Sequence, residues 1–429
     1  MNVKVSGTRW KPSLALGVAI VLSPVSGAAQ PPPQMRVTLD QAIEFARDHN
    51  HALQAARTTI QQNQAQEVTA NLRPNPVLLG DWQFLPVFDW SNFNSDYLSS
   101  VTQFDLGVSY LFERGDKRAR RLQAAKDQTA VTTAQVSDTE RGLAFNVASQ
   151  FVAAVLAEST LDFAQQALTS FQQTVTVSQD RFNAGGLSEG DLLKIKLQLL
   201  QFQMDVSTTR LAKVQAMASL RQLLGYELVP ENYEVAGTLA YVPVRSSEDD
   251  LKALAVQQRP DLRAAQLGVT SAESQRALAI ANGKRDVTAQ FSYTHVAQTN
   301  TGSLFANIEI PIFDKNQGEI ARTGFAVTQS QQLSSEQSSI VMTDVVNAYE
   351  AVKSAASVVN LYDAGYLKQA QDSLDISQYA FQRGAATLLD FLDAQRTYRS
   401  TQLAYRQALA TYMLAVEQLR QAVGTRNLP

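Results

Sequence analysis

Apolar and polar residues alternate along three stretches of the chain. Residues 105–113 (DLGVSYLFE), 286–295 (DVTAQFSYTH) and 306–312 (ANIEIPI) place apolar side chains at every second position, with mostly polar ones between them. Successive side chains of a β-strand point to opposite faces of the sheet. This period of two therefore predicts strands with one apolar and one polar face.

A fourth strand is expected where the pattern is less regular. Residues 77–90 are rich in apolar residues but contain Pro86, which cannot donate a hydrogen bond to a sheet. The polar stretches 91–100 and 297–303 have the composition of loops. The predicted strand pairs therefore lie at about residues 76–113 and about 286–313.

Each strand pair is followed by a very long helical stretch. Residues 117–181 contain no proline and only Gly142, and residues 324–383 contain no proline and only Gly365 in their interior. A helix of about 65 residues extends for about 100 Å. Alanine, glutamine, serine, threonine and leucine dominate both stretches, which favours close packing of helices as in a coiled coil.

Shorter helical stretches are predicted at residues 39–72, 191–224, 249–282 and 390–423. The short helix before a strand pair and the one after the long helix together match the long helix in length. Two short helices stacked end to end can therefore pair antiparallel with each long one. The turn between the long helix and the second short helix then forms the tip of a hairpin, opposite the strands.

The two tips have related sequences. FNAGGLSEGD starts at Phe182 and FQRGAATLLD starts at Phe381, with glycine and aspartate at matching positions. The same spacing along the chain places LRQLLG (220–225) on LRQAVG (419–424). We interpret the chain as a tandem repeat, with a first repeat at 38–225, a connecting segment at 226–247 and a second repeat at 248–425.

The tip segments, residues 182–191 and 381–390, have the composition of tight turns between helices. Glycine in such a turn accepts a positive φ at little cost. In the second tip Asp390 and Asp393 are three residues apart, so they share one face of a helix. Asp390 is also a candidate N-cap of the last helix, and both roles can hold.

The composition excludes several kinds of chemistry. The 429 residues include no cysteine and three histidines, and the net charge is −3. Disulfides, cysteine metal sites and lipidation of an N-terminal cysteine are excluded, and no nucleic-acid partner is expected. His49 and His51 would point to different faces of a helix, so we predict no metal site. Without a Gly-x-Ser-x-Gly or Walker motif, we predict neither an enzyme nor a cofactor.

The N-terminus has the three parts of a signal peptide. Basic residues precede an apolar core at residues 14–22, and small residues lead to a cut near Ala29. Residues 1–29 are therefore the predicted signal peptide, and residues 30–37 a proline-rich linker. The mature protein is expected to be exported.

A membrane-inserted form would have to be a β-barrel. After the signal peptide, no apolar run has the length of a membrane helix, and only helices and closed barrels satisfy the backbone in lipid. A bacterial barrel needs about eight strands or more, so other copies must supply the rest. Three copies in a cyclic oligomer would give twelve strands.

Together these features resemble the TolC family of outer-membrane efflux proteins. The resemblance covers nearly the whole mature chain and rests on RPNP (73–76), YLFERGDKRARRLQAA (110–125), PIFDKNQGEIAR (311–322) and the duplicated tips. RPNP and GDKRAR are most similar to the branch with the CzcC and CusC heavy-metal efflux channels. The resemblance implies a mainly α-helical fold with a β-barrel part. Long antiparallel helical hairpins form a periplasmic tunnel, and four strands per chain enter a trimeric, twelve-stranded outer-membrane barrel.

The resemblance also implies a function and partners. A homotrimer would be the outer-membrane exit duct of a tripartite efflux system and would passively conduct substrates, including heavy-metal cations. Its partners would be a periplasmic adaptor (membrane fusion) protein, an inner-membrane pump of the resistance-nodulation-division type and outer-membrane lipid. The protein would lie in the cell outer membrane and extend into the periplasm.

Site residues follow from the acidic motif of the family at the second tip, which reads LDFLDA (389–394) in this chain. Asp390 and Asp393 take its acidic positions, and Asp191 takes the acidic position of the first tip. We expect these three at the pore constriction, where close carboxylates raise one another's pKa and attract cations. The residues expected in the tip turns and in adaptor docking are Gly185, Gly186, Gly384, Phe182, Phe381, Leu389 and Leu392.

The chain departs from the family at two tip positions. A tyrosine and an arginine that help to hold the entrance shut in the family are replaced here by Phe381 and Ala386. Asp191 therefore lacks both expected partners, and Lys194 is the nearby cation that could pair with a tip aspartate.

Two other functions are compatible with parts of this pattern. A channel of a type I protein secretion system would have the same fold. An exported coiled-coil structural protein without a pore would share the long helices, although the alternating strands argue against it.

Overall fold

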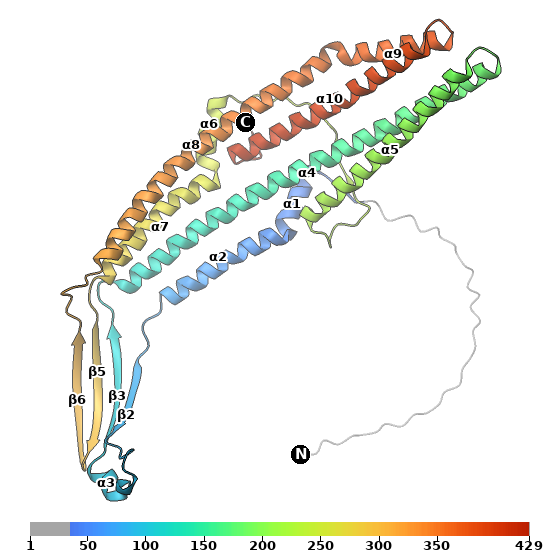
Figure 1. The fold of residues 1–429 in the computed structure, drawn as a ribbon. Helices are drawn as coiled ribbons and strands as arrows, with labels where there is room; N and C mark the ends of the chain where they lie inside the picture. The colour runs from blue at the N-terminus through green and yellow to red at the C-terminus, as the bar shows by residue number, and fades with distance from the viewer. Residues whose placement is uncertain (1–34, 429) are drawn as a thin grey trace, which may run out of the picture.

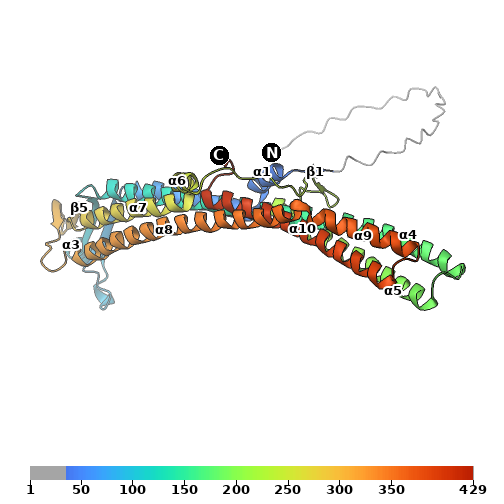
Figure 2. The same ribbon diagram turned by 90° about the horizontal axis from the view of Figure 1, so that it is seen from above.

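The computed structural model describes residues 35–428 and shows an elongated chain with a sheet at one end (Figure 1). Long helices extend from the sheet side by side and end in two hairpin tips, as the second view also shows (Figure 2). The predicted signal peptide lies outside the described residues.

The sheet contains one hairpin from each repeat. Its strands are β2 (Val77–Gln83), β3 (Gln103–Phe112), β5 (Val287–Val296) and β6 (Thr299–Ile308), antiparallel in the order β2-β3-β5-β6. The ladder between β3 and β5 joins the repeats and pairs Val108 with Phe291. Strands β2 and β6 each have one unpaired edge within the chain.

The two faces of the sheet differ as the period of two predicts. One face carries Val108, Phe291 and Leu304, all exposed, while the opposite face carries polar residues such as Gln290 and Ser292. A large exposed apolar face on a four-stranded sheet is typical of a surface that contacts lipid or protein.

The last strand was wrongly placed by the sequence pattern. We predicted it at residues 306–312, whereas β6 covers Thr299–Ile308, which includes most of the stretch predicted as a loop (297–303) and only the first three residues of the predicted strand. Ala297 and Gln298 both have positive φ, 47° and 66°, and together make a two-residue hairpin turn. The strand ends before Pro311, and the alternation beyond Ile308 belongs to no strand.

The first long helix is continuous and the second is not. Helix α4 covers Lys117–Asn183, close to the predicted 117–181. The second predicted helix, 324–383, is instead α8 (Gln317–Leu361), a π-helical turn (Tyr362–Tyr366) and α9 (Leu367–Gln382). Gly365 has a φ of 127°, which no helix continues through, so the single-helix prediction was wrong there.

The short helices before the strands are also divided. We predicted single helices at 39–72 and 249–282, but the structure has α1 (Leu39–His49), α2 (His51–Ala70), α6 (Glu248–Gln258) and α7 (Pro260–Asn282). Asn50 and Arg259 occupy the two breaks in extended conformations. Pro260 begins α7 because its missing N–H is tolerated at the first helical position.

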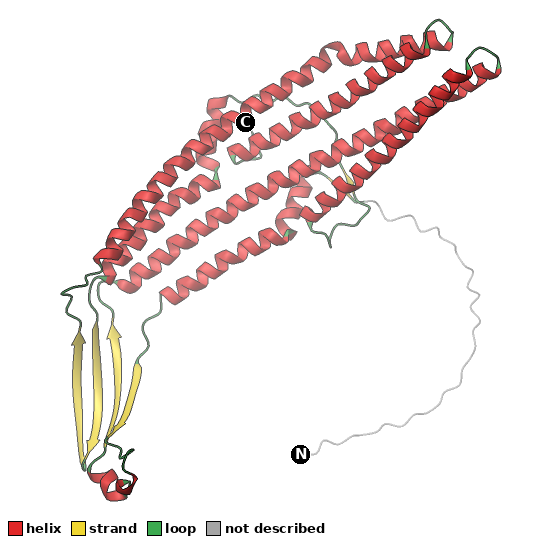
Figure 3. Cartoon of the chain, viewed as in Figure 1, coloured by secondary structure: helices red, strands yellow, loops and turns green. Residues whose placement is uncertain are grey.

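The remaining elements refine the sequence prediction (Figure 3). Helices α5 (Glu189–Leu224) and α10 (Leu388–Val423) complete the hairpins, and α3 (Ser95–Ser100) lies inside the predicted loop 91–100. The strand predicted at 77–90 was too long, because β2 ends at Gln83 before Pro86 and a 3-10 turn covers Trp90–Asn92. Strand β1 (Arg36–Val37), in the predicted linker, pairs parallel with β4 (Glu234–Val235) in the connecting segment.

The helices pack around α4 and α8. Helix α4 contacts α1, α2, α5, α7 and α10, while α8 contacts α7 and α10. Among residues 35–428, α4 alone is long and apolar enough to cross a membrane by length and composition. Core helices of other proteins share that property, and α4 packs against five helices, α1, α2, α5, α7 and α10.

Side chains at equivalent positions of the two repeats donate hydrogen bonds to the end of the corresponding helix in each half. The last carbonyls of a helix have no partner within the helix. Asn50 donates through Nδ2 to the Leu223 carbonyl at the end of α5 (3.1 Å). Arg259 donates through Nη1 to the Ala422 carbonyl at the end of α10 (3.2 Å). The interruption of the short helix thus supplies a donor for the end of the hairpin.

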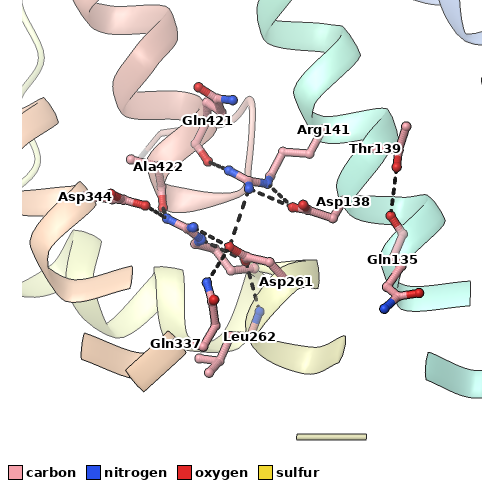
Figure 4. Close-up of polar contacts among 11 residues, drawn as sticks. Gln135, Asp138, Thr139, Arg141, Asp261, Leu262, Gln337, Asp344, Gln421 and Ala422 are labelled. Atoms are coloured by element: carbon pink, nitrogen blue, oxygen red, sulfur yellow. Dashed lines mark hydrogen bonds and ion pairs between the residues drawn. The ribbon is translucent and has the colours of Figure 1, made fainter. Parts of the chain in front are cut away.

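In the second half this contact is part of a larger polar junction, drawn in Figure 4. Arg259 is almost fully buried, and its guanidinium binds Asp261 and Asp344, the latter at 2.8 Å. Arg141 of α4 donates to the Gln421 carbonyl (2.6 Å) and lies 3.6 Å from Asp261. Asp261 therefore links α4 of the first repeat to the second repeat.

The junction predicts a pH dependence of stability. Burial raises the pKa of Asp261, but hydrogen bonds and charge from Arg259 and Arg141 outweigh burial and hold it below its ordinary value of 3.8. Because the folded pKa is the lower one, ionised Asp261 stabilises the fold above about pH 4, and that contribution is lost as pH falls through the folded pKa.

We therefore expect Asp261→Asn to lower the thermal unfolding midpoint at neutral pH and to differ much less from the native protein in acid. Asp48→Asn, at an exposed position, is the control and should leave the pH profile unchanged. If the unfolding midpoint of Asp261→Asn stays below that of the native protein by the same amount down to acid pH, ionised Asp261 is not the source of the stabilisation.

Candidate functional site

The two hairpin tips lie side by side at the end of the molecule farthest from the sheet (Figures 1 and 2). A shared apolar cluster joins them, with buried Phe171, Ile195 and Phe202 from the first hairpin and Phe381 and Phe391 from the second. The rings of Phe381 and Phe391 stack at 5.3 Å between centroids. The candidate site is therefore one unit built from both repeats.

The first tip reverses through two glycines, as expected. Gly185 has a φ of 78°, and the Gly186 N–H donates to the Arg181 carbonyl (2.8 Å). This pattern satisfies a carbonyl at the end of α4 and requires a residue that tolerates the left-handed region. Phe182, expected in the tip turn, is half-buried at the last turn of α4.

Asp191 is held within its own hairpin. Ser188 caps α5 and donates through Oγ to Asp191 Oδ2 (2.8 Å), and Lys194 Nζ lies 3.3 Å from Asp191 Oδ1. The hydrogen bond from Ser188 and the contact with Lys194 lower the pKa of Asp191. Lys194 thus pairs with a tip aspartate, although an ion pair this exposed adds little stability.

Asp390 belongs to a capping box at the start of α10. The N-cap is Thr387, not Asp390, so the capping alternative was wrong in its position. Asp390 Oδ2 accepts from the Thr387 hydroxyl (2.6 Å) and backbone N–H (3.1 Å), and Thr387 Oγ1 accepts from the Asp390 N–H (3.2 Å). These two bonds from Thr387 lower the pKa of Asp390, so the carboxylate is ionised and fixed in direction.

Asp393 lies one turn further along α10 and is exposed. Its Oδ1 accepts from Arg396 Nη2 at 2.6 Å. Both partners are exposed, so the pair leaves Asp393 free to face other charges. Gly384 has a φ of 75° and turns the chain before this acidic pair, as predicted for its position.

The predicted docking residues separate into exposed and buried ones. Leu389 is 76% exposed and Leu392 is half-buried. Phe381 lies in the apolar cluster at 4% exposure, so it supports the tip from inside and offers no docking surface in this conformation.

Arg181 is a tip residue that the sequence reasoning missed. Its Nη1 donates to the Phe381 carbonyl (2.5 Å), its Nη2 donates to the Gly186 carbonyl (3.1 Å), and the guanidinium lies 5.2 Å from the Phe381 ring centroid. One side chain therefore bridges both hairpins. A signal was present in the sequence, because the equivalent residue of the second repeat is Ala380.

A second polar bridge lies further from the tips. Arg399 of α10 forms an ion pair with Asp205 of α5, and its guanidinium lies 4.2 Å from the Phe202 ring centroid. Neither charge has a counterpart in the other repeat, where Leu200 and Ala404 stand. Within residues 35–428, no group of three or more His, Asp and Glu side chains is placed to hold a metal ion.

The arrangement defines a class of protein. A four-stranded amphipathic sheet with free edges, joined to helical hairpins that end in acidic tips, is a subunit of a channel that spans a membrane and extends far beyond it. The chain belongs to the outer membrane efflux protein family, whose model matches residues 42–226 and 251–425. It is therefore an outer-membrane efflux channel, and the fold class inferred from the TolC resemblance is confirmed.

Related proteins agree with this identification. The cobalt-zinc-cadmium resistance protein CzcC of Cupriavidus metallidurans is 23% identical over 393 residues, covering 88% of each chain. Outer membrane protein TolC of Escherichia coli K12 is 24% identical over 364 residues, covering 79% of this chain and 72% of TolC. A crystal structure of CusC has a TM-score of 0.73 at 20% identity and covers 90% of this chain and 92% of that one.

Proposed function

We propose that three copies of this chain form the exit duct of a tripartite efflux system that exports heavy-metal cations. The duct would open to the periplasm at the tips, where a periplasmic adaptor and an inner-membrane pump of the resistance-nodulation-division type deliver substrate. The acidic, inter-repeat tip carries this proposal, because it concentrates fixed negative charge where cations would enter.

The trimer is supported by the sheet. Edge strands with unpaired N–H and C=O groups cannot remain open in lipid. Strand β2 of one copy can pair with β6 of the next, and three such pairs close twelve strands around a lumen lined by the polar face. The exposed apolar face, with Leu106, Val108 and Phe291, then faces the hydrocarbon.

The preference for cations is supported by the state of the tip carboxylates. Asp390 is ionised and oriented by its capping box, and Asp393 is exposed one turn away. A three-fold axis would bring six such carboxylates to one constriction. Rings of Asp and Glu select cations in this way in channels.

Removing the charges of Asp390 and Asp393 should abolish the preference of the channel for cations. We expect the Asp390→Asn/Asp393→Asn double variant to lose most of its cation selectivity, measured as the reversal potential of single channels across a salt gradient. The physical reason is the loss of fixed charge at the narrowest point.

Asp372 and Asp375 provide a matched control, since they are also three residues apart but lie on α9 two to three turns before the second tip turn. The Asp372→Asn/Asp375→Asn variant removes the same charge and should keep its selectivity. Equal loss of selectivity in both double variants would mean that total charge, not the tip, sets the preference.

The metal substrate is supported by the names of two relatives, CzcC and the cation efflux system protein CusC of E. coli K12. A second candidate substrate is a siderophore, since the pyoverdine export protein OpmQ of Pseudomonas putida is 24% identical and covers 94% of this chain. Deleting the gene and measuring resistance to zinc, cobalt and cadmium beside siderophore release separates the two candidates.

A further inference from the structure

The connection between β2 and β3 is far longer than the sheet requires. Gln83 and Gln103 are paired at the end of the ladder, so a two-residue turn could join them, as Ala297 and Gln298 join β5 to β6 at the same end. The chain instead inserts residues 84–102, called here the β2–β3 loop. The loop lies beyond the sheet, at the end away from the helices (Figures 1 and 3).

The loop exposes large apolar side chains. Phe88 is fully exposed and Trp90 is 71% exposed, and the Trp90 ring contacts Phe93 at 5.8 Å between centroids. Phe84 and Val87 are exposed as well. Exposed apolar groups gathered in one place indicate a surface that another apolar phase covers.

The polar groups of the loop bind one another. Asp89 accepts from the Ser91 hydroxyl and from Asn92 Nδ2 (2.9 Å), and Asn94 Oδ1 accepts from the Tyr97 N–H (2.9 Å). Asp89 and Asp96 are the only charged residues of the loop. The loop therefore exposes its aromatic rings beside polar groups that are already hydrogen-bonded to one another, which is the combination favoured at a membrane–water interface.

We propose that the β2–β3 loop lies in the headgroup region of the outer leaflet and inserts Phe88 and Trp90 at the boundary with the acyl chains. This rests on the insertion of the sheet as a barrel, which places the helix-free end of the sheet at the outer surface. The loop continues from Trp82, on the apolar face of β2. Aromatic rings accompanied by hydrogen-bonding groups favour this interface over both water and hydrocarbon.

Within residues 35–428, the surface next to the loop is short and polar. The neighbouring connection at this rim is the β5–β6 turn, and the residues around it are His295, Gln298, Asn300 and Thr301. In the closed barrel that turn of the next copy would flank the loop on its other side. Lipid is therefore the apolar phase within reach of Phe88 and Trp90.

Tryptophan fluorescence tests the proposal directly, because the chain has only Trp10, Trp82 and Trp90. Trp10 belongs to the predicted signal peptide, so in the mature protein Trp82→Phe leaves Trp90 as the single tryptophan and Trp90→Phe leaves Trp82. Each trimer is placed in phosphatidylcholine vesicles whose acyl chains carry bromine near the headgroup. We expect both single tryptophans to lose much of their emission to the brominated lipid and little to aqueous acrylamide.

Two outcomes would overturn the loop assignment while leaving the channel intact. If lipid quenches Trp82 but Trp90 is quenched only by acrylamide, the loop projects into water. If lipid quenches Trp82 and neither reagent reaches Trp90, the loops of the three copies bury one another. If lipid quenches neither tryptophan, the sheet is not in the bilayer, and both this proposal and the channel proposal fail.

Discussion

Arg181→Ala should open the periplasmic entrance. We expect the population of open channels to be about tenfold higher in this variant than in the native protein, measured from single-channel conductance in planar bilayers. Among the described residues, Arg181 donates hydrogen bonds to both tips, to the Phe381 and Gly186 carbonyls. A hydrogen bond from a charged donor contributes about 1.5–3 kcal/mol, and about 1.4 kcal/mol is a factor of ten in an equilibrium.

We expect the second hairpin to be the one that moves on losing this contact, because its long helix is interrupted. Gly365 interrupts the helix between α8 and α9, whereas α4 is continuous. The segment beyond Gly365 is attached to the first hairpin through the tip cluster, Arg181 and the Arg399–Asp205 pair. We therefore propose that Arg181 holds the tips together in place of the tyrosine and arginine that Phe381 and Ala386 replace.

Arg383→Ala is the matched control. Arg383 is also a tip arginine, but its guanidinium lies over Tyr379 of its own helix, at 4.7 Å from the ring centroid. Removing it changes the tip charge equally and leaves the inter-hairpin bonds intact. An equal rise in conductance for both variants would mean that charge, and not the bridge, holds the tips together.

Arg259→Leu should destabilise the protein by about 3–5 kcal/mol, because removing one partner of a buried ion network leaves the others uncompensated. Asp261 would lose its principal cation, Asp344 would lose its 2.8 Å contact, and the Ala422 carbonyl would lose a donor. The change is measured as the thermal unfolding midpoint of the detergent-solubilised protein by circular dichroism.

Arg263→Leu provides the comparison for this effect. Arg263 lies one helical turn from Arg259 on α7 and is exposed, so its loss should cost at most about 0.5 kcal/mol. A further double variant, Arg259→Leu/Asp261→Asn, should recover part of the lost stability because it removes the Asp261 charge that has lost its partner. If Arg259→Leu unfolds at the same temperature as the native protein, the junction does not stabilise the contact between the two repeats.

Much of the architecture was predictable because it repeats and is periodic. The period-two alternation predicted β3 and β5, and the absence of proline predicted α4 almost to its ends. The failures occurred where one residue changed the backbone path. The sequence pattern gave no clear reason to expect that Ala297 and Gln298 would adopt positive φ, or that Gly365 would break one long helix while Gly142 did not break the other.

The candidate site was predictable only in its backbone and its acids. Glycine spacing located the turns, whereas the N-cap of α10 was predicted at Asp390 and is Thr387. Arg181 was missed because its partners are carbonyl oxygens, which every residue has and no motif records. The burial of Phe381 likewise depends on how the two hairpins pack together, which a single repeat does not reveal.

The most direct test of the channel assignment is the conductance of purified, reconstituted trimers with a multivalent cation added to one side at a time. We predict a small, steady, cation-selective conductance that is blocked from the side of the tips and not from the side of the sheet. A trimer that inserts into the bilayer and conducts anions preferentially, or is blocked equally from both sides, would contradict an acidic entrance built by Asp390 and Asp393.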